Sequence, residues 1–165
     1  MDATTRASLW EQFGASLEML ANAIRACSDK LWADPTRQPQ FWYTAYHTLF
    51  YLDLYLSDAT DGFMPPAPFT LSELDPAGVL PDRVYSKTEL LDYLAHGRGK
   101  ARARIESLTA ESAGEPCRYG WLDLTKVEAL LYNMRHVQHH AAQLNLLLRQ
   151  AVNDAPHWIR RSSDL

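Results

Sequence analysis

The chain of 165 residues contains only two cysteines, Cys27 and Cys117. Two cysteines cannot build the disulfide framework on which many small secreted domains depend, and this pair shows no metal-ligand spacing. We interpret both as buried small apolar residues of a protein in a reducing compartment. The sequence therefore predicts a cytoplasmic protein.

Long hydrophobic runs are also missing. No stretch approaches the roughly 18 apolar residues of a membrane span. The first residues, MDATTRASLWEQFG, have neither a cationic start nor an apolar core of signal-peptide length. We therefore expect neither secretion nor insertion into a membrane.

The sequence has no dense stripe of basic residues, and its net charge is −4. Neutralising a phosphate backbone requires such a stripe, so nucleic acid and an anionic membrane surface are disfavoured as partners. One short basic cluster alternates with small residues, which is typical of a solvated helix face. It consists of Arg98, Lys100, Arg102 and Arg104.

The composition is that of an ordinary globular protein, with 47% hydrophobic and 22% charged residues. A chain of this length can bury enough surface to fold without cross-links. We expect residues 1–165 to form a single domain.

Four segments carry apolar residues at steps of three and four, the spacing of one helical face. The first predicted helix spans about residues 4–30, and the second spans about residues 40–57 after a proline-containing turn. The third predicted helix covers about residues 86–108 and the fourth about residues 125–152.

Two capping boxes mark where the last two helices begin. Ser86 is followed by Glu89, and Thr125 by Glu128, at the spacing that satisfies two free backbone amides reciprocally. Both helices are therefore predicted to begin at these residues.

About 30 residues rich in proline and glycine separate the second and third helices. They are too many for a hairpin turn and too proline-rich for regular structure. Such a connection can return the chain along the helices, which makes helices two and three parallel. The predicted fold is all-α, a four-helix bundle with a long crossover between helices 2 and 3.

A histidine pair lies in the fourth helix. His136 and His140 are four residues apart on one face, which continues through Leu144 and Leu147. A buried imidazole without partners leaves ring nitrogens unsatisfied, and one metal ion would remove that cost for both residues. Hydrogen-bonded core histidines remain the alternative interpretation.

His47 of the second helix is embedded in an aromatic segment, where a solvated histidine is improbable. We predict that it is the third ligand. Three neutral imidazoles suit zinc, nickel, copper or ferrous iron and leave a coordination position open. We expect one divalent transition metal, with zinc or nickel favoured and iron as a further candidate.

Polar neighbours of these histidines have two interpretations. Asn133 and Gln143 lie three residues beyond either end of the histidine pair. They could orient water or substrate, or they could form hydrogen bonds between helices. Tyr43 and Asp53 lie one turn and nearly two turns from His47 and could act behind the ligands.

The other three histidines receive no ligand role. His139 points about 100° away from His140 and is interpreted as a rim residue. His96 and His157 lie in polar surroundings.

Two stretches, YTAYHTLFYLDLYL and NMRHVQHHAAQLNLLLR, resemble the DinB-like (DinB/YfiT) family of metal-binding four-helix bundles. The resemblance covers almost the whole chain and implies that His47, His136 and His140 hold the metal. The family's helix-four motif commonly reads HHRGQ or HHVGQ, whereas residues 139–143 read HHAAQ. The missing glycine concerns helix packing more than ligation.

Related proteins include S-transferases that use mycothiol or bacillithiol and a mycothiol-dependent maleylpyruvate isomerase. The resemblance thus implies a metal-dependent enzyme, a hydrolase or S-transferase, that activates a water or low-molecular-weight thiol toward a small-molecule substrate. One alternative is a non-catalytic, metal-stabilised bundle of stress-response type. Another is a metal-free pocket in which the histidines anchor a small ligand.

The second predicted helix has more aromatic residues than one bundle face can bury. A second copy of the chain could cover the remainder, so the sequence predicts a homodimer.

Overall fold

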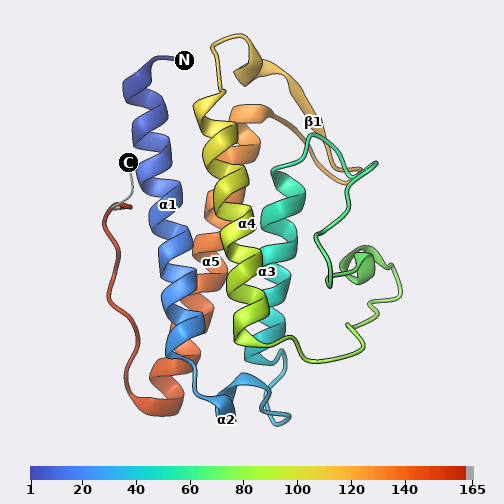
Figure 1. Cartoon of the computed structure of the whole chain (residues 1–165), viewed down its shortest axis with the longest axis vertical. Helices are drawn as coiled ribbons and strands as arrows, with labels where there is room; N and C mark the ends of the chain where they lie inside the picture. Colours follow the sequence, from blue (N-terminus) through green and yellow to red (C-terminus); the bar gives the residue numbers. More distant parts are fainter. Residues whose placement is uncertain (163–165) are drawn as a thin grey trace.

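The computed structural model describes residues 1–162. Most of these residues are helical, and four long helices lie side by side (Figure 1). α1 and α3 each pack against both α4 and α5. The four helices are α1 (Ala3–Ala26), α3 (Phe41–Tyr55), α4 (Lys87–Glu106) and α5 (Lys126–Val152).

The chain direction differs between the helices. Figure 1 shows α3 and α4 running in the same direction, opposite to α1 and α5. Residues 56–86, here called the connecting segment, return the chain from the end of α3 to the start of α4. The connecting segment contains one short 3-10 helix, η1 (Leu71–Leu74).

Both capping boxes are confirmed. The side chain of Ser86 accepts a hydrogen bond from the amide of Glu89, whose carboxylate accepts one from the Ser86 amide. Thr125 and Glu128 form the same reciprocal pair at the start of α5. Local sequence thus fixes where these two helices begin.

The predicted first helix over residues 4–30 is wrong at its end. α1 stops at Ala26, Cys27 has an extended backbone, and a separate short helix follows, α2 (Asp29–Trp32). The Ser28 hydroxyl accepts from the Leu31 amide at 3.3 Å and caps this new helix. A serine that caps a second helix competes with continuation of the first one.

The predicted helical class holds for most of the chain, and the structure adds one short pair of strands. Residues 107–125 contain a 3-10 helix, η2 (Ser112–Gly114), and an antiparallel pair of short strands, β1 (Pro116–Arg118) and β2 (Asp123–Thr125). Gly120 has a φ of +85° in the turn between the strands. Strands of three residues are too short to leave an alternating pattern that sequence reasoning can recognise.

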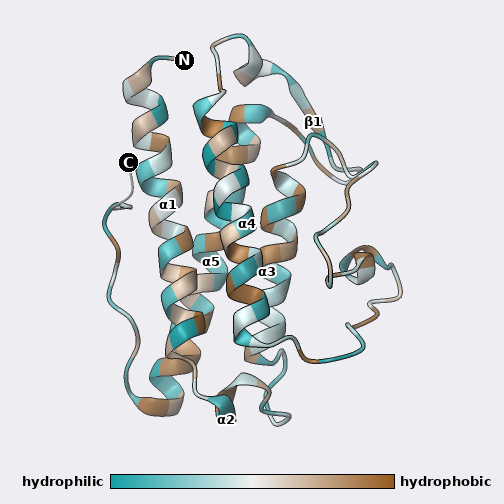
Figure 2. Ribbon diagram, viewed as in Figure 1, coloured by the Kyte–Doolittle hydropathy of each residue, from teal (hydrophilic) through white to brown (hydrophobic). Residues whose placement is uncertain are grey.

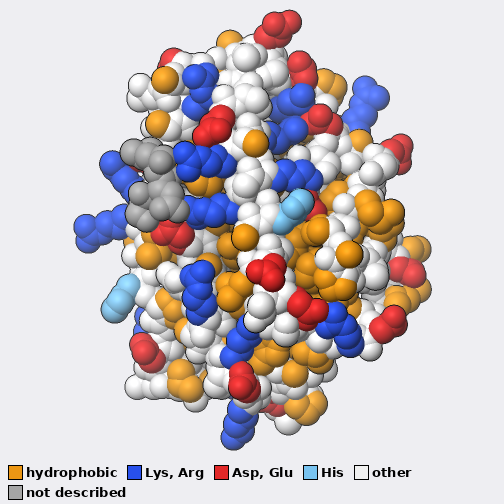
Figure 3. Space-filling view, in the orientation of Figure 1, with side chains coloured by type: hydrophobic (Ala, Val, Ile, Leu, Met, Phe, Trp, Pro, Cys, Tyr) orange, Lys and Arg blue, Asp and Glu red, His pale blue; other side chains and the backbone are white. Residues whose placement is uncertain are grey.

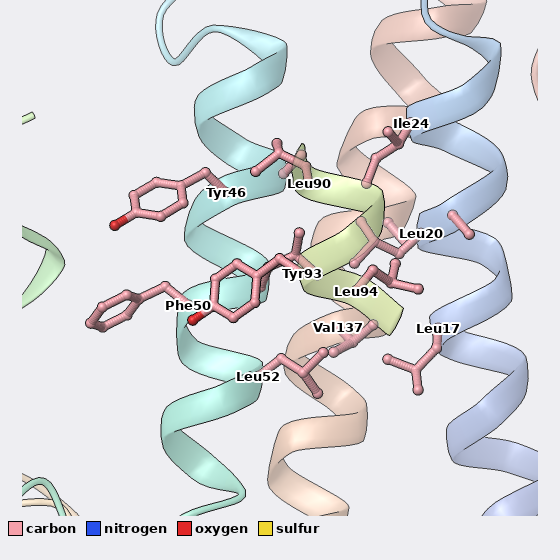
Figure 4. Close-up of a cluster of buried hydrophobic side chains, with 14 of the residues drawn as sticks. Leu17, Leu20, Ile24, Tyr46, Phe50, Leu52, Leu90, Tyr93, Leu94 and Val137 are labelled. Carbon is pink, nitrogen blue, oxygen red and sulfur yellow. The ribbon is translucent and has the colours of Figure 1, made fainter. Parts of the chain in front are cut away.

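Most aromatic residues of α3 are buried inside the chain, and Tyr43 and Tyr51 are half-buried. Figure 4 shows Leu17, Leu20 and Ile24 of α1 pointing into the space between the helices, whereas Tyr46 and Phe50 of α3 point away from α1. The connecting segment covers this outer side of α3, where its Phe63 and Phe69 rings contact the rings of α3.

Phe69 of the connecting segment stacks on Tyr46 with ring centroids 5.9 Å apart and on Tyr93 of α4 at 4.3 Å. Phe63 contacts Phe50 edge-on at 5.4 Å. The connecting segment therefore covers aromatic residues of α3 that the sequence analysis assigned to a dimer contact. The homodimer stays a prediction, but the number of aromatic residues in α3 no longer supports it.

The connecting segment carries several exposed hydrophobic residues. Figure 3 shows hydrophobic side chains gathered on the side of the molecule where this segment lies. The large exposed ones in the segment are Met64, Leu71, Val79, Leu80 and Val84.

Within residues 1–162, no helix combines the length and the apolar character needed to cross a membrane. Figure 2 shows both hydrophobic and hydrophilic residues along the long helices.

We expect Phe69→Ala to lower the free energy of unfolding by about 3 kcal/mol, because it removes a buried ring that joins the connecting segment to two helices. Urea denaturation measures the change. Leu71→Ala is the matched control, since Leu71 lies in the same segment and is 39% exposed. Its expected effect is within about 0.5 kcal/mol. Equal losses in both variants would contradict this account.

Candidate metal centre

The structure brings the three predicted ligands together between two packed helices. His47 comes from α3, and His136 and His140 come from α5. One ring nitrogen from each residue lies within 4.8 Å of those of the other two. The ring centroids are 5.7 Å apart for His47 and His136 and 4.6 Å apart for His136 and His140. This three-histidine group could hold a metal ion.

Two of the rings have defined partners on Nδ1. His47 Nδ1 lies 2.6 Å from Glu73 Oε2, and His140 Nδ1 lies 2.7 Å from Gln143 Oε1. A carboxylate or amide oxygen can only accept, so Nδ1 carries the proton in both rings. The lone pair of each neutral ring is then on Nε2, the atom that remains for a metal.

His136 supplies the independent test of whether a metal fits. Its Nε2 is buried and has no hydrogen-bond partner. The ring also forms a hydrogen bond with the Thr48 backbone. A buried ring nitrogen without a partner costs free energy, and a coordinated cation would remove that cost. The residues present therefore fit a metal ion.

His136 and His140 are held in the neutral form that metals require. Burial, together with the neighbouring His140 and His47, lowers the pKa of His136 to about 3. Burial also lowers the pKa of His140 to about 4, although the hydrogen bond to Gln143 opposes the shift. Both rings are thus in the neutral form, with one ring proton each, at neutral pH.

Aromatic rings surround the cluster. Tyr51 lies 4.8 Å from His47 and 5.9 Å from His136 between centroids, and Tyr55 lies 5.9 Å from His136. They limit the access of water to the imidazoles from this side and account for much of the burial.

Two cavities reach the histidines. One of about 300 Å³ touches two of the three predicted ligands and is lined by Pro39, Tyr43, Thr44, His47, His140 and Gln143. A larger one of about 620 Å³ is lined by α1, α5 and the C-terminal segment, and it touches His136 and His139. The first cavity offers a small molecule the more direct approach to the cluster.

Glu73 is the residue that sequence reasoning missed. It lies on η1 of the connecting segment, 26 residues after His47, and its side chain is 3% exposed. The segment has no periodic pattern, so no sequence signal indicates which of its side chains reaches α3.

Tyr43, which the sequence analysis named as a residue that could act behind the ligands, contacts the Glu73 carboxylate. Its hydroxyl forms a hydrogen bond to Glu73, and burial together with the Glu73 charge raises the pKa of Tyr43. Tyr43 thus reaches His47 both through Glu73 and by a direct ring contact at 6.4 Å between centroids, and it also lines the smaller cavity.

Gln143 and Asn133 have different surroundings. Gln143 accepts from His140 and donates to His139 Nε2 at 3.1 Å, so it orients one of the predicted ligands. Asn133 is fully buried, and its Nδ2 donates to the Leu52 carbonyl of α3 at 2.9 Å. The Leu56 amide bonds to the carbonyls of Asp53 and Leu54 instead of to Leu52. Asn133 thus forms a bond between helices, one of its two predicted roles.

Asp53, considered as a residue behind His47, has its carboxylate bonded to α4 instead. Its carboxylate accepts from Lys100 Nζ at 2.5 Å and from the Tyr93 hydroxyl at 3.2 Å, both on α4. Lys100 also donates to Ser57 at 3.0 Å, so this member of the basic cluster is not simply solvated. Successive turns of α3 face different neighbours, and Asp53 faces α4.

The remaining histidines match their predicted surroundings. His139 and His157 are exposed, and the side chain of His96 is 46% exposed. Among the described residues, the metal-type cluster contains only His47, His136 and His140.

Comparison with known families gives one match. The sequence model of the DinB superfamily matches residues 10–144, which include all three clustered histidines. None of the curated proteins matches the chain.

We expect the metal-free protein to lose stability as the pH falls from 7 to 5. Below a pKa of about 6.5 the unfolded chain takes up protons at His136 and His140, whereas the folded protein keeps both rings neutral at pH 5. The loss from His136 alone is up to about 2 kcal/mol. Urea denaturation with a chelator present, at both pH values, measures it.

The control for this prediction changes one ring at a time. His136→Phe should show a smaller difference between the two pH values, while the exposed His157→Ala should keep the wild-type difference. An equal difference in wild type and His136→Phe would be inconsistent with a buried neutral imidazole.

Asn133→Leu tests the two roles predicted for Asn133. The substitution leaves the Leu52 carbonyl without its partner, so we expect the free energy of unfolding to fall by about 1–3 kcal/mol. Zinc affinity, measured by calorimetry below the unfolding temperature, should stay within twofold of wild type. A loss of zinc binding in a folded variant would instead favour the role in orienting groups at the metal.

Proposed function

The chain belongs to the DinB superfamily, and from this premise we propose that His47, His136 and His140 bind one divalent transition metal. The observation that carries the proposal is the buried Nε2 of His136, which has no partner and faces two further imidazoles. Zinc and nickel are the favoured ions and iron a further candidate, because imidazole ligands suit all three.

The proposal includes the family architecture. The four long helices form a four-helix bundle, and the connecting segment is the long crossover between its second and third helices. Two observations support this assignment. α3 and α4 run in the same direction, and α3 packs on α5 while α4 packs on α1 (Figure 1).

We propose further that the site is catalytic. A divalent ion on three neutral imidazoles, when bound, lowers the pKa of a coordinated water or thiol and so supplies a nucleophile at neutral pH. The cavity of about 300 Å³ beside His47 and His140 would admit a small substrate or a low-molecular-weight thiol. Hydrolysis and thiol transfer are the reaction types that fit this arrangement.

The chain's own residues have distinct tasks in this proposal. Gln143 fixes the ring of His140, and Tyr43 lines the same cavity. Tyr51 and Tyr55 exclude water behind the imidazoles. Each of these groups restricts orientation or solvent, which is the contribution that a protein makes around a metal.

A non-catalytic role is the second candidate, favoured by the origin of the ligands on two helices. A metal held by α3 and α5 together would join them and would stabilise only the folded chain. At a metal concentration a hundred times the dissociation constant, this linkage contributes about 2.7 kcal/mol. Thermal stabilisation by metal without turnover of any hydrolysis or thiol-transfer substrate would favour this alternative.

Elemental analysis of protein purified without a metal-affinity tag tests the metal proposal. We expect about one transition-metal ion per wild-type chain and at least a tenfold lower content in His47→Ala and in His136→Ala. His157→Ala is the control, because its exposed ring lies outside the cluster, and it should keep the wild-type content. Wild-type protein that takes up neither zinc, nickel nor anaerobic ferrous iron would refute the proposal.

A further inference from the structure

We propose that Glu73 is a positioning residue for His47, and that through it metal binding holds the connecting segment in place over α3. This inference rests on the metal site proposed above. It assigns a function to a residue outside the three-histidine group, on a segment that has no ligand of its own.

The geometry excludes Glu73 as a direct ligand. Its carboxylate meets His47 at Nδ1, 2.6 Å away, while the ligand atom of a neutral ring with a proton on Nδ1 is Nε2. The two ring nitrogens face different directions, so the carboxylate lies behind His47. A carboxylate in this place fixes the tautomer and rotation of a ligating imidazole and raises its basicity.

The burial of Glu73 needs an explanation that folding does not supply. Its side chain is 3% exposed and its Oε1 is buried without a hydrogen-bond partner. Removing a carboxylate from water is costly, and this one is bonded to the His47 ring and the Tyr43 hydroxyl. A cation bound through His47 would provide the opposite charge that this carboxylate lacks.

The attachment of Glu73 extends to its backbone and to its neighbours. The Tyr51 hydroxyl donates to the Glu73 carbonyl at 3.2 Å, and the Tyr46 hydroxyl donates to the Thr70 carbonyl at 3.3 Å. Tyr46 and Tyr51 belong to the helix that carries His47. Residues 70–73 are therefore seated on α3 by side chains on either side of the predicted ligand.

Linkage makes the effect reciprocal. If zinc binds more tightly when Glu73 is seated behind His47, then bound zinc must favour the seated form of residues 70–73 by the same factor. The connecting segment then responds to the state of the metal site, although it contributes no ligand.

Zinc titration of the full chain by calorimetry tests the first half of the inference. We expect Glu73→Ala to weaken zinc binding by about 10- to 100-fold, the usual effect of removing a group behind a ligating histidine. Glu73→Gln keeps an acceptor for Nδ1 without the charge and should recover part of the loss. Asp61→Asn, an exposed acid of the same segment, is the control and should bind like wild type.

Two further measurements separate positioning from simple loss of packing. In ¹⁵N spectra of the imidazoles, the metal-free wild type should show His47 protonated on Nδ1, and Glu73→Ala should show a mixture of tautomers. Hydrogen exchange of residues 70–74 should slow at least threefold with zinc in wild type and in Asp61→Asn, but not in Glu73→Ala.

The outcomes distinguish this inference from the function on which it rests. A wild-type chain that binds no zinc overturns both. Zinc binding by wild type that is unchanged in Glu73→Ala, with equal protection of residues 70–74, overturns the role of Glu73 alone and leaves the metal site standing.

Discussion

The meeting of three half-buried imidazole rings among aromatic side chains is the constraint on which the rest of this structure depends. Burial favours neutral rings, and a neutral ring needs one partner for its N–H and another for its lone pair. Glu73 and Gln143 accept from two of the rings, while Nε2 of His136 has no partner. Gln143 lies one turn from His140 on α5, whereas Glu73 must be brought to His47 by the connecting segment.

The connecting segment acts on this arrangement in two ways. Its Phe69 covers aromatic rings of α3 and α4 that would otherwise face water, and its Glu73 reaches behind His47. Hydrophobic burial holds the segment on the helices, and this in turn places one carboxylate accurately. A stretch that looks like a spacer in sequence thus becomes part of the site's surroundings.

Side chains from other parts of the chain also hold the end of α3. The last four carbonyls of a helix lack partners within it. Asn133 of α5 donates to Leu52, Lys100 of α4 to Asp53, and Tyr119 from the loop between the strands to Tyr55. Three separate parts of the chain therefore fix this end. Their side chains account for the role of Asn133, which the sequence left open, and for the position of Asp53.

The sequence by itself determined the predominantly helical class, the starts of α4 and α5, the family, and the residues that form the histidine cluster. These features are encoded locally, because capping boxes act over three residues and one helical face repeats over four. Tertiary structure alone decided that Asp53 turns to Lys100, that Phe69 covers α3, and that Glu73 bonds to His47. An irregular segment has no period to reveal which side chain points where, so its contacts exist only once the helices have packed.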